Sequence, residues 1–204
     1  MKVMKMVCVL AALVALTGMQ AQGTVIYPND DCSTRGSTLY NATSPFGLLV
    51  KNSSDVAWVE FDLGETPAEL ARLVLHNDDT GVTNPWEITV KGAEFNIDTA
   101  SFTGTNVSDW ENVGSIPGVL AVDFYSLDVT DFYNSHLGQT VTLQLGRASQ
   151  PSGSGPIFED MEGTKTGDGL TYGPRLEVTP VPEPSCVVMM LVGAAYVYRR
   201  RVHR

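Results

Sequence analysis

Hydrophobic and polar residues alternate along much of the middle of the chain. In residues 57–63 every second side chain is apolar, and Trp58, Glu60 and Asp62 occupy the opposite face. This period of two is typical of half-buried antiparallel strands. Comparable runs follow at 71–76, 86–90, 120–129, 140–145 and 175–178. About eight or more strands in roughly 155 residues predict an all-β fold, a single antiparallel, jelly-roll-like β-sandwich over residues 24–179.

Helical patterns are short in this region. We expect single helical turns at 67–70 and directly after Thr130, whose hydroxyl is of the type that caps a first turn. Segments rich in Asn, Asp, Gly, Ser and Pro, such as 77–81 and 151–156, separate the strands as turns.

The N-terminus has the three parts of a secretory signal peptide. Lys2 and Lys5 precede an apolar run at 7–16, and small and polar residues follow it. A ten-residue helix is about 15 Å long, too short for a bilayer core of roughly 30 Å. We therefore predict a helical signal peptide over residues 1–21, which signal peptidase removes after Ala21 or, as a second choice, after Gly23.

The C-terminus combines the motif Pro182-Glu183-Pro184, an apolar run at 186–198 and the arginines Arg199, Arg200 and Arg201. This order resembles the PEP-CTERM sorting tail, here residues 181–204 with a short hydrophobic helix. The resemblance implies a Gram-negative source, transient anchoring in the inner membrane and cleavage near the motif by an exosortase-type enzyme. The positive-inside rule independently keeps the arginines cytoplasmic, and the prolines leave the motif extended. An anchor that is never cleaved is the alternative.

Four segments of the body follow one another in the order typical of a second family. They read WVEFDL at 58–63, ARLVL at 71–75, LDVT at 127–130 and YGPRLEV at 172–178. This series resembles DNRLRE-type domains, which are related to disaggregatase repeats. The resemblance implies a secreted β-sandwich, and some members bind acidic polysaccharides. Residues 158–162 depart from the family pattern, so no binding residue is carried over.

Charge is distributed very unevenly. The chain has a net charge of −10, but residues 22–180 hold 7 basic and 22 acidic residues, a balance of −15. Such a body repels phosphate backbones, which argues against nucleic acid as a partner. It also repels acidic polysaccharide, unless calcium bridges the two or Lys51, Lys91 and Arg147 lie close together.

Residues for catalysis are scarce. His76 and His136 are the histidines of the body, and neither stands beside a nucleophile motif. We expect His76 on a solvated strand face. Cys32, the body's single cysteine, has no disulfide partner there and is expected to be buried. The pattern predicts a protein that is not an enzyme.

Acidic pairs and tryptophans are the remaining candidates for binding. Asp30-Asp31 and Asp78-Asp79 are either solvated surface charge or oxygen ligands of a structural Ca²⁺ ion, the one cofactor that the loops suggest. Trp58, Trp86 and Trp110 either stack on sugar rings or pack into the sandwich.

The leading hypothesis is an exported, non-catalytic protein of the cell surface or extracellular matrix. It would act in adhesion or polysaccharide binding, with signal peptidase, an exosortase-type enzyme and extracellular polysaccharide as partners. Two alternatives stay open: a polysaccharide-degrading enzyme on the same fold, and a purely structural surface protein.

Overall fold

The computed structural model of the chain describes residues 23–40, 47–51, 54–97, 110–148, 154–164, 166–181 and 193. Gly23–Thr179 forms one compact unit. The signal peptide with its cleavage site at Ala21, the motif Pro182-Glu183-Pro184 and the cluster Arg199–Arg201 lie outside the described residues, so these predictions stay predictions. Within the described ranges, no helix has both the length and the apolar character needed to cross a membrane.

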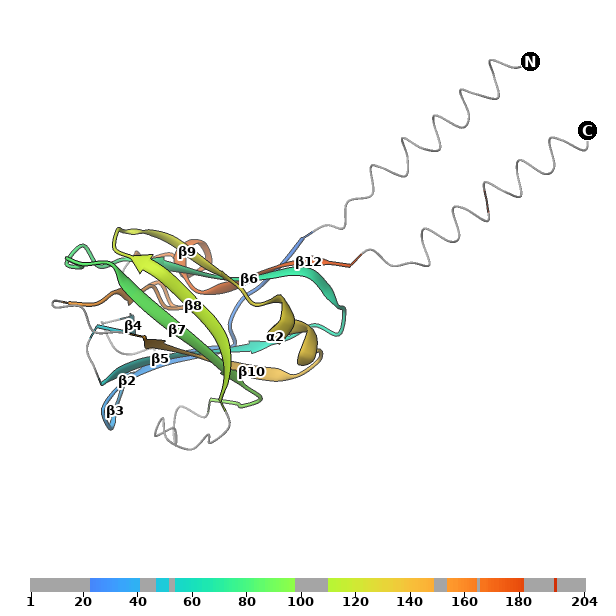
Figure 1. Cartoon of the computed structure of the whole chain (residues 1–204), viewed down its shortest axis with the longest axis horizontal. Helices are drawn as coiled ribbons and strands as arrows, with labels where there is room; N and C mark the ends of the chain where they lie inside the picture. Colours follow the sequence, from blue (N-terminus) through green and yellow to red (C-terminus); the bar gives the residue numbers. More distant parts are fainter. Residues whose placement is uncertain are drawn as a thin grey trace, which may run out of the picture. The chain divides into compact units, whose positions relative to one another are not determined.

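Short strands make up most of the described chain (Figure 1). In chain order the strands are β1 (Thr24–Ile26), β2 (Asp30–Arg35), β3 (Thr38–Tyr40), β4 (Leu48–Leu49), β5 (Asp55–Asp62), β6 (Ala68–Asn77), β7 (Trp86–Ala93), β8 (Glu111–Val119), β9 (Asp123–Asp128), β10 (Thr140–Arg147), β11 (Ile157–Phe158) and β12 (Arg175–Pro180). The helices are α2 (Thr130–Ser135) and α3 (Gly169–Tyr172).

The strands form two antiparallel sheets of six strands each. The first sheet has the order β1-β12-β6-β11-β4, with β9 also paired to β6, and the second has the order β3-β2-β5-β10-β7-β8. The chain changes sheet repeatedly, for example from β5 to β6 to β7, as it does in jelly rolls. The predicted antiparallel β-sandwich is confirmed.

The core lies between the sheets and follows the predicted alternation. Val59 and Phe61 of β5 are fully buried, and they pair in register with Leu143 and Val141 of β10. These side chains pack in one apolar cluster with Leu73 of β6 and with residues of β7 and β12. Burial of alternate side chains from both sheets is what the period of two requires.

The outer face of the second sheet is covered as well. Trp58 packs there in a smaller cluster with Cys32 and Ile97. The segment that brings Ile97 over the sheet is held by Thr142, whose hydroxyl donates to the Phe95 carbonyl at 2.7 Å. Cys32 is buried as expected, and burial raises the pKa of its thiol far above the usual value.

The short helices only partly match their predictions. The helix after residue 129 exists, but Val129 is its N-cap residue and supplies no side-chain cap, so the predicted capping role of Thr130 is wrong. Thr130 Oγ1 instead accepts a hydrogen bond from Ala71 N at 2.9 Å, on the neighbouring strand. The predicted turn at 67–70 is also wrong, because β6 begins at Ala68.

Six strands of the described chain lie outside the predicted runs, namely β1, β2, β3, β4, β8 and β11, and two of them show why. β8 contains Gly114, Pro117 and Gly118, which are typical of turns, and its pairing with β7 has two register shifts. β2 includes Asp30 and Asp31, which we expected in a loop. The predicted strand at 120–129 begins only at β9, because residues 120–122 form the connection from β8.

Candidate functional site

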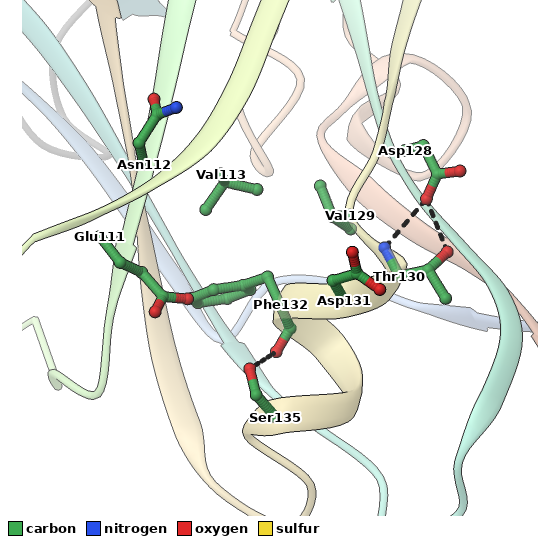
Figure 2. A pocket seen from close by; sticks show the side chains of 9 residues that line it. All are labelled: Glu111, Asn112, Val113, Asp128, Val129, Thr130, Asp131, Phe132 and Ser135. Atoms are coloured by element: carbon green, nitrogen blue, oxygen red, sulfur yellow. Dashed lines mark hydrogen bonds between the residues drawn. The ribbon is translucent and has the colours of Figure 1, made fainter.

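A cleft of about 550 Å³ opens where edge strands of the two sheets approach each other (Figure 2). Its walls come from the beginning of β8, the end of β9 and helix α2. Three kinds of side chain line it: apolar Val113, Val129 and Phe132, neutral polar Asn112, Thr130 and Ser135, and the carboxylates Glu111, Asp128 and Asp131. A concave surface with an apolar part and a few convergent polar groups is the usual form of a ligand site.

Helix α2 is fixed tightly to the first sheet. Asn134 brackets Ala68 of β6: its side-chain oxygen accepts from Ala68 N at 2.8 Å, and its Nδ2 donates to Ala68 O at 2.9 Å. Together with the Thr130–Ala71 bond described above, these contacts attach both ends of the helix to one strand. The wall of the cleft that α2 forms is therefore attached to the first sheet.

The apolar part of the cleft belongs to the core. Phe132 is 6% exposed and packs against Gly92 of β7. A Cβ atom at position 92 would clash with Cε2 of the ring, so glycine is needed for this close approach. The sequence of β7 thus makes room for the ring that forms the base of the cleft.

The carboxylates lie at the solvent-exposed part of the cleft. Asp128 Oδ1 accepts hydrogen bonds from Thr130 Oγ1 at 2.6 Å and Thr130 N at 3.0 Å, as Figure 2 shows. These bonds, the hydroxyl first, lower the pKa of Asp128 below its ordinary value of 3.8. Asp128 therefore keeps its negative charge over the whole neutral range.

Positive charge is present near the cleft but not in its lining. None of the lining residues, all of them in the described chain, is Lys, Arg or His. Arg72 of β6 lies opposite Asp128 in the pairing of β6 with β9, and Lys91 of β7 lies opposite Asn112. His136 Nδ1 is 4.0 Å from Glu111 Oε1. The lining itself remains acidic.

Ser135 and His136 come close together but do not form a nucleophile with its base. His136 Nδ1 lies 2.9 Å from Ser135 Oγ and also 2.9 Å from the Phe132 carbonyl oxygen. A carbonyl only accepts, so Nδ1 carries the hydrogen in that contact and has no lone pair for the serine proton. Ser135 Oγ itself donates to the same carbonyl at 2.9 Å. The serine is therefore not activated by this histidine.

Carboxyls with raised pKa values are found elsewhere in the fold. Burial, the largest cause in each case, raises the pKa of Asp30, Asp31, Glu60 and Glu162. Neighbouring carboxylates raise the pKa further for Asp31, Glu60 and Glu162. None of the four lines the cleft. A glycosidase needs one carboxyl with a raised pKa beside a second carboxylate at the sugar. The cleft does not show that pairing.

Burial corrects the prediction for two of the three tryptophans. Trp58 and Trp86 are each 1% exposed, so neither presents a ring face to a sugar. Trp86 packs into the core of the sandwich, as the alternative predicted, and Trp58 packs in the smaller cluster on the outer face of the second sheet. Trp110 is half-buried, and its ring lies 5.3 Å from that of Trp58. Trp110 thus packs against Trp58 with part of its surface still exposed, and its stacking on a sugar stays a prediction.

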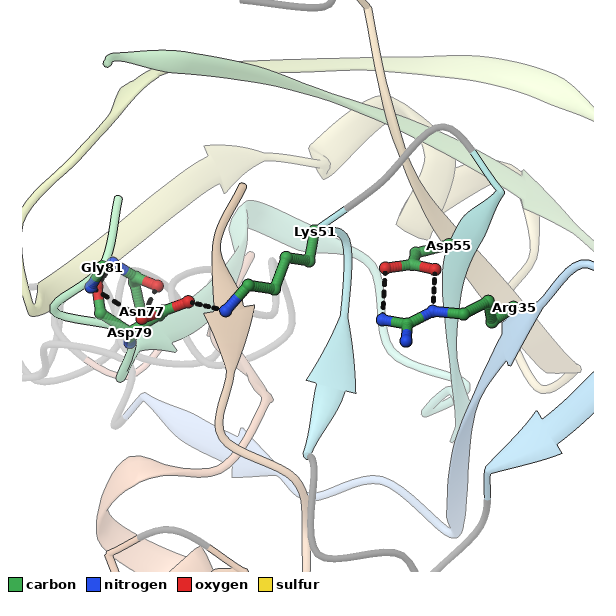
Figure 3. A network of polar contacts seen from close by, with 6 residues as sticks. All are labelled: Arg35, Lys51, Asp55, Asn77, Asp79 and Gly81. Carbon is green, nitrogen blue, oxygen red and sulfur yellow. Dashed lines mark hydrogen bonds and ion pairs between the residues drawn. The ribbon is translucent and has the colours of Figure 1, made fainter. Parts of the chain in front are cut away.

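The acidic pairs do not assemble into a metal site. Asp79 Oδ2 binds Lys51 Nζ at 2.8 Å, and its Oδ1 accepts from Gly81 N at 2.7 Å (Figure 3). Asp31 is buried and accepts from Met161 N at 2.7 Å. In the part of the chain that is described, no group of three or more His, Cys, Asp or Glu residues is arranged to hold a metal ion. The side chains of Asp30, Asp31, Asp78 and Asp79 thus do not fit the expected Ca²⁺ site.

Figure 3 also shows a second ion pair, between β2 and β5. Arg35 Nε and Nη2 bind the two oxygens of Asp55 at 2.8 and 3.1 Å, and the side chain of Asp55 is fully buried. This two-point contact ties neighbouring strands together and is structural.

One aromatic group was missed in the sequence. His76 is 7% exposed, contrary to our expectation, and its ring lies 4.8 Å from both Phe124 of β9 and Tyr172 of α3. Arg175 lies over the Phe124 ring at 5.1 Å. The period of two placed His76 correctly on the outer face, but it contains no information about the α3 segment that covers this face.

Comparisons with known proteins find no family model and no curated protein that matches the sequence. The resemblances to the PEP-CTERM tail and to DNRLRE-type domains rest on the motifs quoted above.

Proposed function

We propose that this chain is an exported, non-catalytic β-sandwich protein that binds extracellular polysaccharide in the cleft between β8, β9 and α2. In this proposal signal peptidase removes residues 1–21. The C-terminal tail holds the protein in the inner membrane until an exosortase-type enzyme cleaves near Pro182-Glu183-Pro184, and the sandwich then acts at the cell surface or in the matrix.

The cleft is the observation that carries the binding role. A sugar has apolar C–H faces and a rim of hydroxyls, and the cleft offers an apolar base beside amide, hydroxyl and carboxylate groups. Two observations support a non-catalytic role. His136 does not activate Ser135, and the carboxyls whose pKa is raised lie outside the cleft lining.

Binding is tested with the purified full chain and a panel of neutral, acidic and amino polysaccharides, with and without calcium. We expect retention on at least one of them, and loss of retention when Asn112→Trp fills the cleft from an exposed strand position. Glu69→Trp, at an exposed position of β6 outside the cleft lining, is the matched control and should bind as the parent does. If the chain is retained on none of the polysaccharides, the binding role is wrong. If it releases reducing ends from any of them, the non-catalytic role is wrong.

Sorting is tested separately in cells. Changing Arg199, Arg200 and Arg201 together to Ala removes the cytoplasmic charge that opposes translocation of the tail. We expect the uncleaved precursor to be lost from the membrane fraction. Normal retention and processing of the triple variant would show that the arginines are dispensable.

A further inference from the structure

The lining of the cleft also specifies which class of polysaccharide fits it. The geometry points to a glycan that carries free primary amines, such as a de-N-acetylated amino-sugar polymer. This inference rests on the proposed function and narrows it.

The charged side chains that border the cleft are all acidic. Glu111, Asp128 and Asp131 come from three different elements, β8, β9 and α2, and they border one space of about 550 Å³. Asp128 stays ionised because of its bonds to Thr130. An acidic sugar would bring like charge into this space, whereas an ammonium group would form charge-assisted hydrogen bonds with the carboxylates.

The cations near the cleft do not remove its preference for an ammonium group over an acidic sugar. Arg72 faces Asp128 across the strand pair, Lys91 pairs in register with Asn112, and His136 lies near Glu111. His136 is also 4.0 Å from Glu94 Oε1, which brings a further carboxylate to the same side. Glu111 and Asp131 are exposed to solvent, and neither forms an ion pair with Lys or Arg in the described chain.

The neutral groups argue for a sugar rather than for any cation. Half-buried Val113, with the small exposed part of the Phe132 ring, supplies an apolar surface for ring C–H groups, and Asn112, Thr130 and Ser135 supply partners for hydroxyls. A flexible lysine-rich peptide would use the carboxylates alone. Hexalysine therefore serves as the competitor that separates the two classes of ligand.

The test measures binding of the full chain to four hexamers: glucosamine, N-acetylglucosamine, an acidic uronate and lysine. We expect glucosamine hexamer to bind at least tenfold more tightly than its N-acetylated form, and the uronate not to bind. The double variant Glu111→Gln with Asp131→Asn should weaken glucosamine binding at least tenfold.

A matched control is needed because an acidic protein attracts any polycation. Glu65→Gln with Glu69→Gln removes the same charge from exposed positions outside the cleft lining and should change affinity less than twofold. The inference is overturned if the control weakens binding as much as the cleft variant, or if hexalysine binds as tightly as glucosamine. It is also overturned if the acetylated or acidic hexamer binds at least as well, but then the proposed polysaccharide function survives. If no hexamer and no polysaccharide of the panel binds, both fail.

Discussion

Carboxylates are used in two opposite ways in two regions of this molecule. In the first region Asp31, Glu159 and Asp160 are 0 to 4% exposed and serve as acceptors for backbone N–H groups. They bind Met161 N, Thr166 N and Thr164 N at 2.7 to 2.8 Å and so hold the segment after β11 in place. We call these three residues the buried acids.

In the second region Glu111, Asp128 and Asp131, the cleft acids, lie at the surface of a cleft. The buried acids accept hydrogen bonds from backbone N–H groups. In the described chain Glu111 lies 4.0 Å from His136, Asp131 lies in the first turn of α2, and neither forms an ion pair with Lys or Arg. A buried carboxylate without partners would be too costly to keep, but an exposed one is kept at little cost to stability. The same residue type thus maintains the fold in one region and is exposed to solvent, where we propose that it meets a ligand, in the other.

The largest expected effect concerns the base of the cleft, because it is the part of that region that belongs to the core. Phe132→Ala leaves a cavity next to Gly92 and should lower the free energy of unfolding by about 3–5 kcal/mol. Denaturant unfolding measures this loss. Phe124→Ala, at a ring that is 41% exposed, should cost clearly less. Equal losses would show that Phe132 does not have the core role that we assign to it.

Removing a buried acid comes next. Asp160→Ala leaves the Thr164 N–H without its acceptor and should cost about 1–3 kcal/mol of stability. Asp131→Ala, its counterpart in the cleft, should change stability by no more than about 0.5 kcal/mol. Thermal unfolding of the two variants measures both losses of stability. A larger loss for Asp131→Ala than for Asp160→Ala would contradict the distinction between buried acids and cleft acids.

A third prediction uses pH. Burial, and then the charges of Glu162, Asp160 and Asp30, raises the pKa of Asp31 well above 3.8. The folded state thus holds this proton more strongly than the unfolded state, so stability falls as the pH rises from about 3.8 through the raised value. Asp31→Asn keeps an oxygen acceptor for Met161 N and removes the charge.

We expect Asp31→Asn to gain about 1 kcal/mol at pH 7, a rise in Tm of a few degrees. The gain should vanish near pH 3, where both side chains are neutral. Melting curves from pH 3 to 7 measure this difference. If the difference in Tm between parent and variant is the same at every pH, Asp31 has the same pKa in the folded and the unfolded state, and the prediction is wrong.

The smallest expected effect on stability belongs to the cleft acids. Glu111→Gln with Asp131→Asn should leave Tm almost unchanged, within about 0.5 kcal/mol in stability, because both side chains are exposed. The same double variant should lose amino-sugar binding. A large fall in Tm would show that these carboxylates, like the buried acids, serve the fold.

Much of the sandwich could be predicted, but the site could not. The alternation around Phe61 predicted a strand and its buried face, since a period of two depends only on neighbouring residues. Strand β8 was missed because Gly114, Pro117 and Gly118 interrupt the pattern, and the cleft was missed with it. Trp58 was placed on the correct outer face, yet the segment that covers it comes from residues far along the chain.

The sequence by itself determined the all-β class, the inward faces of the central strands and the strongly acidic body, because periodicity and composition are local properties of the chain. Only the tertiary structure decided which carboxylates are buried acceptors and which surround the cleft. The pairs Asp30-Asp31 and Asp78-Asp79 look alike in sequence, but their surroundings come from different distant segments: Met161 binds Asp31, and Lys51 binds Asp79. Burial and partners depend on contacts between residues far apart in the chain, and these exist only once the two sheets have packed together.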